Sequence, residues 1–183
     1  MTRSTDRGAA EAARHGAARS NRWRTVARKF LAENPSCAVC GRAGDEVQLQ
    51  VHHVVPYHYC TDQRIARPDL ELDPRNLIAL CEHTSSRPAA DHHLVVGHLD
   101  DFRSSNLHVR EDFELNGDPA SVMASPLWLA RRAARMPALD AMTEADLQAL
   151  RDRIAEVYGA EPVVSCTRTT RRSRPNKRAS RTP

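Results

Sequence analysis

The chain has 183 residues, of which 40% are apolar and only 4% aromatic, and its formal net charge is +4. This length suits one domain with a modest core, to which a structural metal ion would add stability. No run approaches the ~18 apolar residues of a membrane helix, and the N-terminus lacks the apolar segment of a signal peptide. We therefore expect a cytoplasmic protein without a membrane partner.

The net charge conceals three regions of different charge. Residues 1–36 carry 8 Lys and Arg against 3 Asp and Glu, residues 37–166 carry 12 against 20, and residues 167–183 carry 7 against none. Basic ends are typical of proteins that bind a phosphate-rich partner, although solvated tails can have the same composition. The candidate nucleic-acid-binding residues of the C-terminal tail are Arg168, Arg171, Arg172, Arg174, Lys177, Arg178 and Arg181.

The N-terminal part predicts a disordered arm followed by a helix. Residues 1–19 are rich in Ala, Arg, Gly and Ser and have no periodic apolar face. Apolar residues then recur at the i, i+3 and i+7 spacing of an amphipathic helix, beginning with Trp23, until Asn34-Pro35 ends the pattern. The arginines on the remaining surface of this helix suit either a core-packing helix or one that faces DNA.

Two cysteines separated by two residues, Cys37 and Cys40, follow this helix. The spacing lets both sulfurs reach one tetrahedral ion, and Gly41 permits a tight turn behind them. A redox pair has the same spacing, but the sequence around it does not have a βαβ pattern. Five cysteines without a secretory signal also argue against a disulfide framework. We interpret the pair as half of a zinc site.

The β-branched run 47–55 predicts a strand that carries His52 and His53. Consecutive side chains of a strand point to opposite faces, so the two histidines should have different roles. The polar segment 57–69 that follows is expected to be a loop.

A second, buried strand is predicted over residues 77–80, after turn residues that include Asn76. The strand ends at Cys81, which can bring a third thiolate beside the first two.

A third element, a helix from Asp91 to Leu99, is expected with Asp91 as its N-cap. His92 and His93 would lie ~100° apart on an α-helix, so that one can face the thiolates and the other the paired histidines.

The C-terminal part predicts two helices with packing roles. Ser125-Pro126 begins the first, because proline suits the first helical position. Thr143, with Asp146 three residues later, caps the second. The apolar stripe of this second helix consists of Leu147, Leu150, Ile154 and Val157.

Four motifs, C-A-V-C, V-H-H-V-V-P, N-L-I-A-L-C and H-H-L-V-V-G-H, occur in an order that resembles the HNH endonuclease family, in particular its phage-type members. The resemblance covers about residues 35–112. It implies an α+β fold, in which a small ββα-metal core stabilised by a structural zinc is flanked by α-helices and disordered basic arms. The expected division is an arm over 1–19, a nuclease domain over 20–118, a helical extension over 119–160 and a basic tail over 161–183.

The resemblance also assigns roles to individual residues. His52 and His93 would bind the catalytic cation, His53 would be the general base, and Asn76 is the central asparagine of the signature. Asn76 would orient His53 by a hydrogen bond or bind the metal through water. The cation would stabilise charge on the scissile phosphodiester, and Mg²⁺, Mn²⁺, Ni²⁺ and Zn²⁺ all remain possible.

The structural zinc site departs from the family pattern at one ligand. Where the family usually has a fourth cysteine directly before the helical histidine, this chain has His92. Cys37, Cys40, Cys81 and His92 still satisfy zinc, which accepts three cysteines and one histidine. His83 is the alternative fourth ligand.

The function implied is a metal-dependent endonuclease that hydrolyses phosphodiester bonds of double-stranded DNA by a single-metal mechanism. The alternative is a non-cleaving, zinc-stabilised module for nucleic-acid binding or phage packaging. The presence of His53 favours the enzyme, because a binding module needs no proton acceptor beside a metal site.

Overall fold

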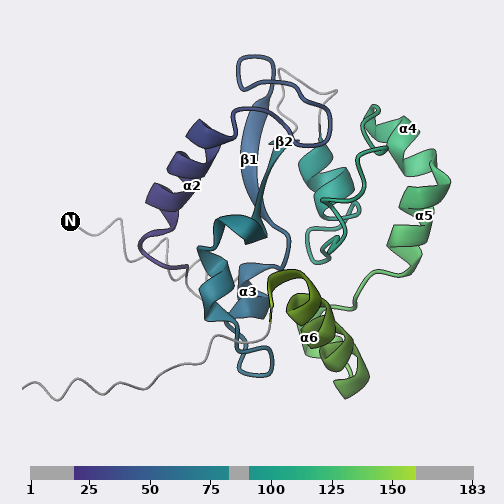
Figure 1. The fold of residues 1–183 in the computed structure, drawn as a ribbon. Coiled ribbons are helices and arrows are strands. Elements are labelled where there is room, and N and C mark those ends of the chain that lie inside the picture. The colour runs from purple at the N-terminus through teal and green to yellow at the C-terminus, as the bar shows by residue number, and fades with distance from the viewer. Residues whose placement is uncertain (1–18, 83–90, 160–183) are drawn as a thin grey trace, which may run out of the picture.

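The computed structural model describes residues 19–82 and 91–159, which form an α+β fold around a two-stranded antiparallel sheet (Figure 1). Strand β1 (Gln48–His53) pairs with β2 (Leu77–Glu82), and the register places His52 opposite Ile78. Helix α2 (Trp23–Glu33) lies on one side of this sheet and the short helix η3 (His93–Gly97) on the other. The two strands and η3 therefore give the ββα arrangement that the sequence predicts.

Helix α2 (Trp23–Glu33) is a surface helix, although it packs against β1. None of its residues is buried, so it does not belong to the core. It ends as expected at Asn34, whose backbone N–H and side-chain amide both donate to the carbonyl of Phe30, at 2.8 and 2.9 Å. Its position beside β1 leaves the arginines on its outer surface available to a partner.

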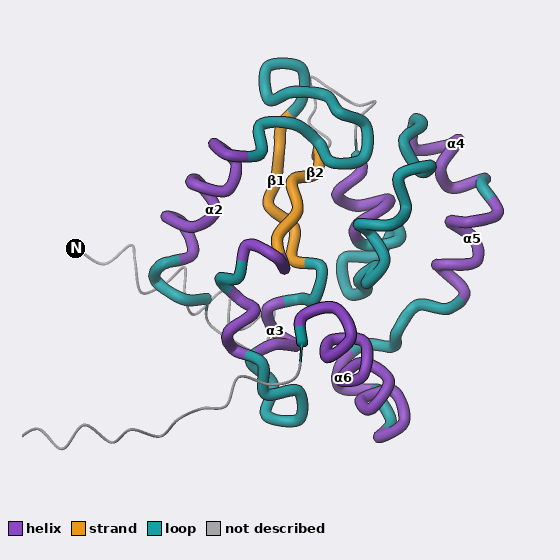
Figure 2. The backbone as a smooth tube through the Cα atoms, in the orientation of Figure 1, coloured by secondary structure: helices purple, strands orange, loops and turns teal. Residues whose placement is uncertain are grey.

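The segment between the strands is more ordered than the polar loop expected over residues 57–69. It contains helix α3 (Tyr57–Cys60), a 3₁₀ turn at Pro68–Glu71 and another at Pro74–Asn76. The reason is burial, because Tyr59, Ile65 and Leu70 from this segment pack into one hydrophobic cluster. Figure 2 shows these short turns below the sheet.

Helix η3 differs from the α-helix expected over 91–99, because it is a π-helix and ends at Gly97. His92 and not Asp91 is the N-cap residue, although the carboxylate of Asp91 accepts the N–H of Leu94 at 3.1 Å. Leu99 and Asp100 stop the helix, with φ values of 52° and 63° in the left-handed region.

Helices α4 (Pro119–Ala124), α5 (Pro126–Ala133) and α6 (Glu144–Tyr158) complete the described chain. Helix α4 was not expected from the sequence, although Asp118 caps it from the position before proline. The indole N–H of Trp128 donates to the carbonyl of Val95 at 2.7 Å, which holds α5 against η3. The C-terminal helices thus share the hydrophobic clusters of the sheet region.

Helix α6 begins with the predicted capping box between Thr143 and Asp146. Its apolar stripe differs at one position, because Val157 is 43% exposed whereas Tyr158 is buried. None of the helices in residues 19–82 and 91–159 is long and apolar enough to span a membrane.

Candidate metal centres and active site

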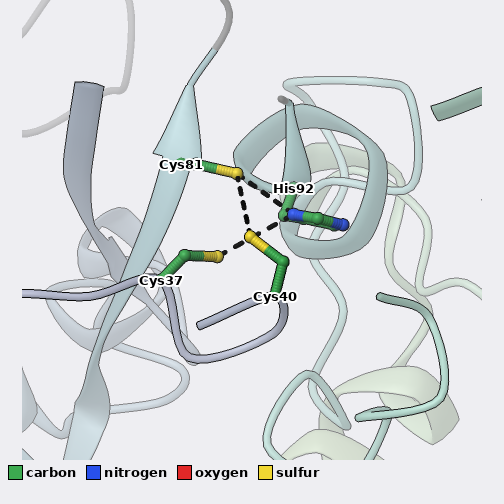
Figure 3. Close-up of side chains that lie close together, drawn as sticks. All are labelled: Cys37, Cys40, Cys81 and His92. Carbon is green, nitrogen blue, oxygen red and sulfur yellow. Dashed lines mark hydrogen bonds between the residues drawn. The ribbon is translucent and has the colours of Figure 1, made fainter. Parts of the chain in front are cut away.

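Three cysteines and a histidine from distant segments converge at the end of β2 (Figure 3). Cys81 Sγ lies 3.0 Å from Nδ1 of His92 and 4.0 Å from Sγ of Cys40. Cys37 Sγ lies 3.8 Å from the same Nδ1. All four ligand atoms lie within 4.8 Å of one another, so the cluster can bind a metal ion. His83, the alternative fourth ligand, lies outside the described residues.

The turn that carries Cys37 and Cys40 positions these two cysteines beside Cys81. Gly41 has a φ of 73°, a conformation that glycine adopts without a steric penalty. This turn lets the N–H of Cys37 donate to the carbonyl of Arg42 at 2.8 Å. The N–H of Ala38 donates to the carbonyl of Ala79 in β2, also at 2.8 Å. This bond holds the turn against the strand that carries Cys81.

The protonation of this cluster suits metal binding. A hydrogen bond from Cys81 lowers the pKa of Cys37 to about 3, despite the opposing effect of burial. One thiolate, the form that binds metal, is therefore present at neutral pH. Nε2 of His92 donates to the carbonyl of Gly117 at 3.1 Å, which leaves Nδ1 as the ligand atom and fixes the ring.

A second cluster consists of His52, His93 and His98, whose ligand atoms also lie within 4.8 Å of one another. His98 was not assigned a role from the sequence. On an α-helix, residues five apart point about 140° away from each other, so His93 and His98 would face different sides. The i→i+5 winding of the π-helix brings them onto one side, facing His52. A π-helix leaves no clear periodic signal from which this could be predicted.

The hydrogen bonds of these histidines leave one nitrogen of each ring available. Nδ1 of His98 donates to the carbonyl of Ser104 at 2.8 Å, and Nδ1 of His93 lies 3.3 Å from the Glu82 carboxylate. Nε2 of His52 is buried and has no hydrogen-bond partner among the described residues. Burial lowers the pKa of His98 to about 4 and also lowers that of His52, so both rings are neutral. A buried, unpaired imidazole nitrogen beside two others fits a divalent cation.

Gly97 lets η3 approach the ring of His52 closely. A methyl group at this position would lie 3.1 Å from Cε1 of His52 and 3.1 Å from Leu80. We expect Gly97→Ala to weaken Mn²⁺ binding at the histidine cluster by roughly 5- to 150-fold, since overpacking typically costs ~1 to 3 kcal/mol. Isothermal titration calorimetry measures this loss. Gly44→Ala is the control, because its methyl group would make an ordinary 3.7 Å contact with Leu49; equal affinities of both variants would contradict the prediction.

Glu82 holds the ring of His93 in place. Its second oxygen accepts from the amides of Gln48 and Gln50 at 3.1 and 2.7 Å, so the carboxylate is itself fixed. Residues that hydrogen-bond to a metal-binding histidine typically contribute about 10- to 100-fold to metal affinity. We therefore expect Glu82→Ala to weaken Mn²⁺ binding by that factor while the metal content of the cysteine cluster stays unchanged. An unaltered Mn²⁺ affinity, or a parallel loss of metal from the cysteine cluster, would show that Glu82 does not act through His93.

His53 lies on the other side of β1 and has a different environment from His52. Its Nε2 lies 2.8 Å from the carbonyl oxygen of Glu71. Because a carbonyl only accepts, Nε2 carries the hydrogen and Nδ1 keeps its lone pair. Burial lowers the pKa of His53 to about 4, and the indole of Trp23 stacks on the ring at a centroid distance of 4.5 Å. A neutral imidazole with a free lone pair can accept a proton.

Residues 37–83, which include the cysteine turn and both strands, match the family model of the HNH endonucleases. This part of the chain is similar to an HNH endonuclease domain. No curated protein and no solved structure matches the chain. The HNH domain associates the chain with nuclease or nucleic-acid-related function, and its family uses divalent metals and acts on DNA.

Asn76 of the HNH domain does not make the expected direct hydrogen bond to His53. Its Nδ2 donates to the carbonyls of Val55 and Leu70, at 2.9 and 3.0 Å. Its Oδ1 accepts the N–H of Val55 at 2.8 Å and the hydroxyl of Tyr158 at 3.1 Å. These bonds occupy the buried amide. They fix the backbone of Val55, just after β1, and of Leu70. Leu70 precedes Glu71, whose carbonyl oxygen accepts the hydrogen bond from His53.

His52, His53, His93 and His98 line one cavity of about 640 Å³, whose walls include residues of α2, β1 and η3. Arg19, Trp23, Tyr57, His58 and Phe102 also line it. Among the described residues that line the cavity there is no carboxylate, although residues 37–166 are acidic overall. The cavity therefore suits an anionic group. The basic tail that was predicted to bind nucleic acid, from Arg168 to Arg181, lies outside the described residues.

Proposed function

We propose that the protein is a metal-dependent DNA endonuclease that hydrolyses phosphodiester bonds by a single-metal mechanism. One observation carries this proposal. Three imidazoles with available nitrogens meet in the same cavity as His53, a neutral imidazole whose Nδ1 lone pair is free. A module that only binds nucleic acid would have no use for this combination.

In the proposed mechanism each histidine has one task. His52, His93 and His98 hold a divalent cation, which when bound neutralises charge on the scissile phosphate and the leaving 3′ oxygen. Nδ1 of His53 accepts the proton of the attacking water, while the bond to Glu71 keeps its ring in place. Asn76 acts as a positioning residue through its hydrogen bonds to the backbone of Val55, two residues after His53, and of Leu70, the neighbour of Glu71. The three-histidine set admits Mg²⁺, Mn²⁺, Ni²⁺ or Zn²⁺.

The second metal is proposed to be a structural Zn²⁺ at Cys37, Cys40, Cys81 and His92. Three sulfurs and one nitrogen are a ligand set typical of structural zinc, with no open position for a substrate. The resemblance to phage-type members of the family, in which zinc stabilises the fold, belongs to this proposal too.

Double-stranded DNA is the proposed partner, and the basic tail should supply part of the attraction. Each phosphate contact contributes about −0.9 to the slope of log K against log salt. Deleting residues 167–183, which carry 7 basic residues, should therefore flatten this slope by several units and weaken binding to all sequences about equally. Titrations of one duplex at several salt concentrations measure the slope. An unchanged slope would mean that the tail makes no phosphate contacts.

The proposed activity is tested by incubating the purified protein with supercoiled plasmid and each of the four cations in turn. Nicked or linear DNA with at least one cation, and intact plasmid without any, is the expected result. Plasmid that stays intact with every cation, while the protein still binds it, would favour the non-cleaving nucleic-acid-binding module.

A further inference from the structure

An exposed aromatic side chain lies at the edge of the histidine cluster. Phe102 is 58% exposed, yet its ring packs beside His98 and His93 at centroid distances of 5.0 and 5.9 Å. The turn that carries it follows the two left-handed residues that end η3. One part of the ring thus contacts the candidate metal ligands, while much of its surface remains open to solvent.

The same cavity has a second aromatic wall. Trp23 of α2 stacks on His53, and Arg19 lies over the rings of Trp23 and Tyr57 at 4.6 and 4.3 Å. In a chain with only 4% aromatic residues, Trp23, Tyr57 and Phe102 all line this one cavity. Aromatic rings stack on nucleobases of any sequence, and basic groups attract the attached phosphates.

The size of the cavity restricts what can enter it. Its volume of about 640 Å³ lies within the range of roughly 300 to 1,000 Å³ that is typical of sites for single small molecules. One or two nucleotides fit a space of this size, whereas a base-paired duplex is far too bulky. A base that reaches the open surface of Phe102 must therefore have left the duplex stack.

We propose that this cavity receives an unpaired nucleotide next to the scissile phosphate, with its base stacked on Phe102. The inference rests on the proposed function for the place of the scissile phosphate, and it defines the substrate class more closely. Extruding a base from an intact duplex costs free energy, and the cost is lowest where the base is already mismatched or unpaired. The preferred substrate is then DNA in which paired flanks surround a mismatched or unpaired stretch at the cut.

Fluorescence anisotropy with two DNA molecules of equal length tests this inference. One is fully paired, and the other has a short central bubble of mismatched bases; both are titrated without added divalent cation, so that binding is measured apart from cleavage. The protein should bind the bubble at least about 10-fold more tightly. Phe102→Leu should lose roughly 5- to 100-fold in affinity for the bubble, because stacking on an aromatic ring contributes strongly for each base.

Two further variants separate stacking from general packing. Phe102→Tyr retains the aromatic face and should bind the bubble like the wild type. Phe113→Leu is the matched control, because Phe113 is also 58% exposed but is not among the residues that line the cavity. Zinc content and circular dichroism establish that each variant is folded.

The outcomes distinguish this inference from the proposed function. Plasmid cleavage combined with equal binding of bubble and duplex, or with unchanged bubble binding by Phe102→Leu, would overturn the inference and leave the nuclease intact. Selective bubble binding through Phe102 without cleavage of any DNA would support stacking of an unpaired base on Phe102, but it would overturn the nuclease and with it the place of that base beside a scissile phosphate. Failure to bind either DNA would overturn both.

Discussion

Replacing His53 with alanine is expected to slow DNA cleavage by about 10²- to 10⁴-fold, the usual contribution of a general base. The change removes Nδ1, which is the only proposed proton acceptor, but none of the candidate metal ligands. Affinity for DNA and for Mn²⁺ should stay within a few-fold of the wild type. Single-turnover cleavage with excess protein measures the chemical step directly.

Two further variants test whether the slower cleavage has a purely structural cause. His53→Gln retains an amide N–H that can donate to the carbonyl of Glu71 but has no basic nitrogen, so it should be as slow as His53→Ala. His108→Ala alters a histidine outside this cavity and should cleave at close to the wild-type rate. Wild-type rates in His53→Gln would show that His53 positions other groups and does not accept the proton.

Replacing Cys81 with serine is expected to abolish zinc binding and to unfold much of the domain at room temperature. Structural zinc in small domains contributes an apparent ~10 to 16 kcal/mol, whereas the net stability of a protein is only about 5 to 15 kcal/mol. Cys81 is fully buried in β2, so replacing it also removes the metal-mediated link between the cysteine turn and the sheet. Elemental analysis and thermal denaturation measure the two effects.

Cys60 provides the control for this substitution. It is equally buried, but it lies in the other hydrophobic cluster, and burial raises the pKa of its thiol to about 12. Cys60→Ala should therefore keep its full zinc content and lose only a little stability. Full zinc occupancy in Cys81→Ser would show that the metal is held elsewhere.

The sequence predicts the parts of the site that depend on short, regular patterns. The β-branched run around His52 and His53 predicts β1, and the spacing of Cys37 and Cys40 predicts the turn beside β2. The capping box at Thr143 predicts the start of α6. In each case the residues that determine the structure are close together in the chain.

The features that sequence patterns do not predict depend on winding and on distant contacts. His98 joins the histidine cluster only because η3 has π-helical winding. Asn76 makes no direct bond to His53, because its amide donates to the carbonyl of Leu70 and accepts from the hydroxyl of Tyr158 in α6. Phe102 lies in a polar stretch whose sequence gives no sign that it borders the cavity. Only the folded chain brings these groups together.

The central claim is that two separate metal sites serve this domain, and that the site formed by three histidines lies beside the general base. Anomalous X-ray scattering from crystals soaked in Mn²⁺, recorded at the zinc and manganese absorption edges, tests it most directly. We predict a zinc peak between Cys37, Cys40, Cys81 and His92, and a separate manganese peak at Nε2 of His52, His93 and His98. Absence of any metal peak at these three histidines, with manganese bound elsewhere, would contradict the account.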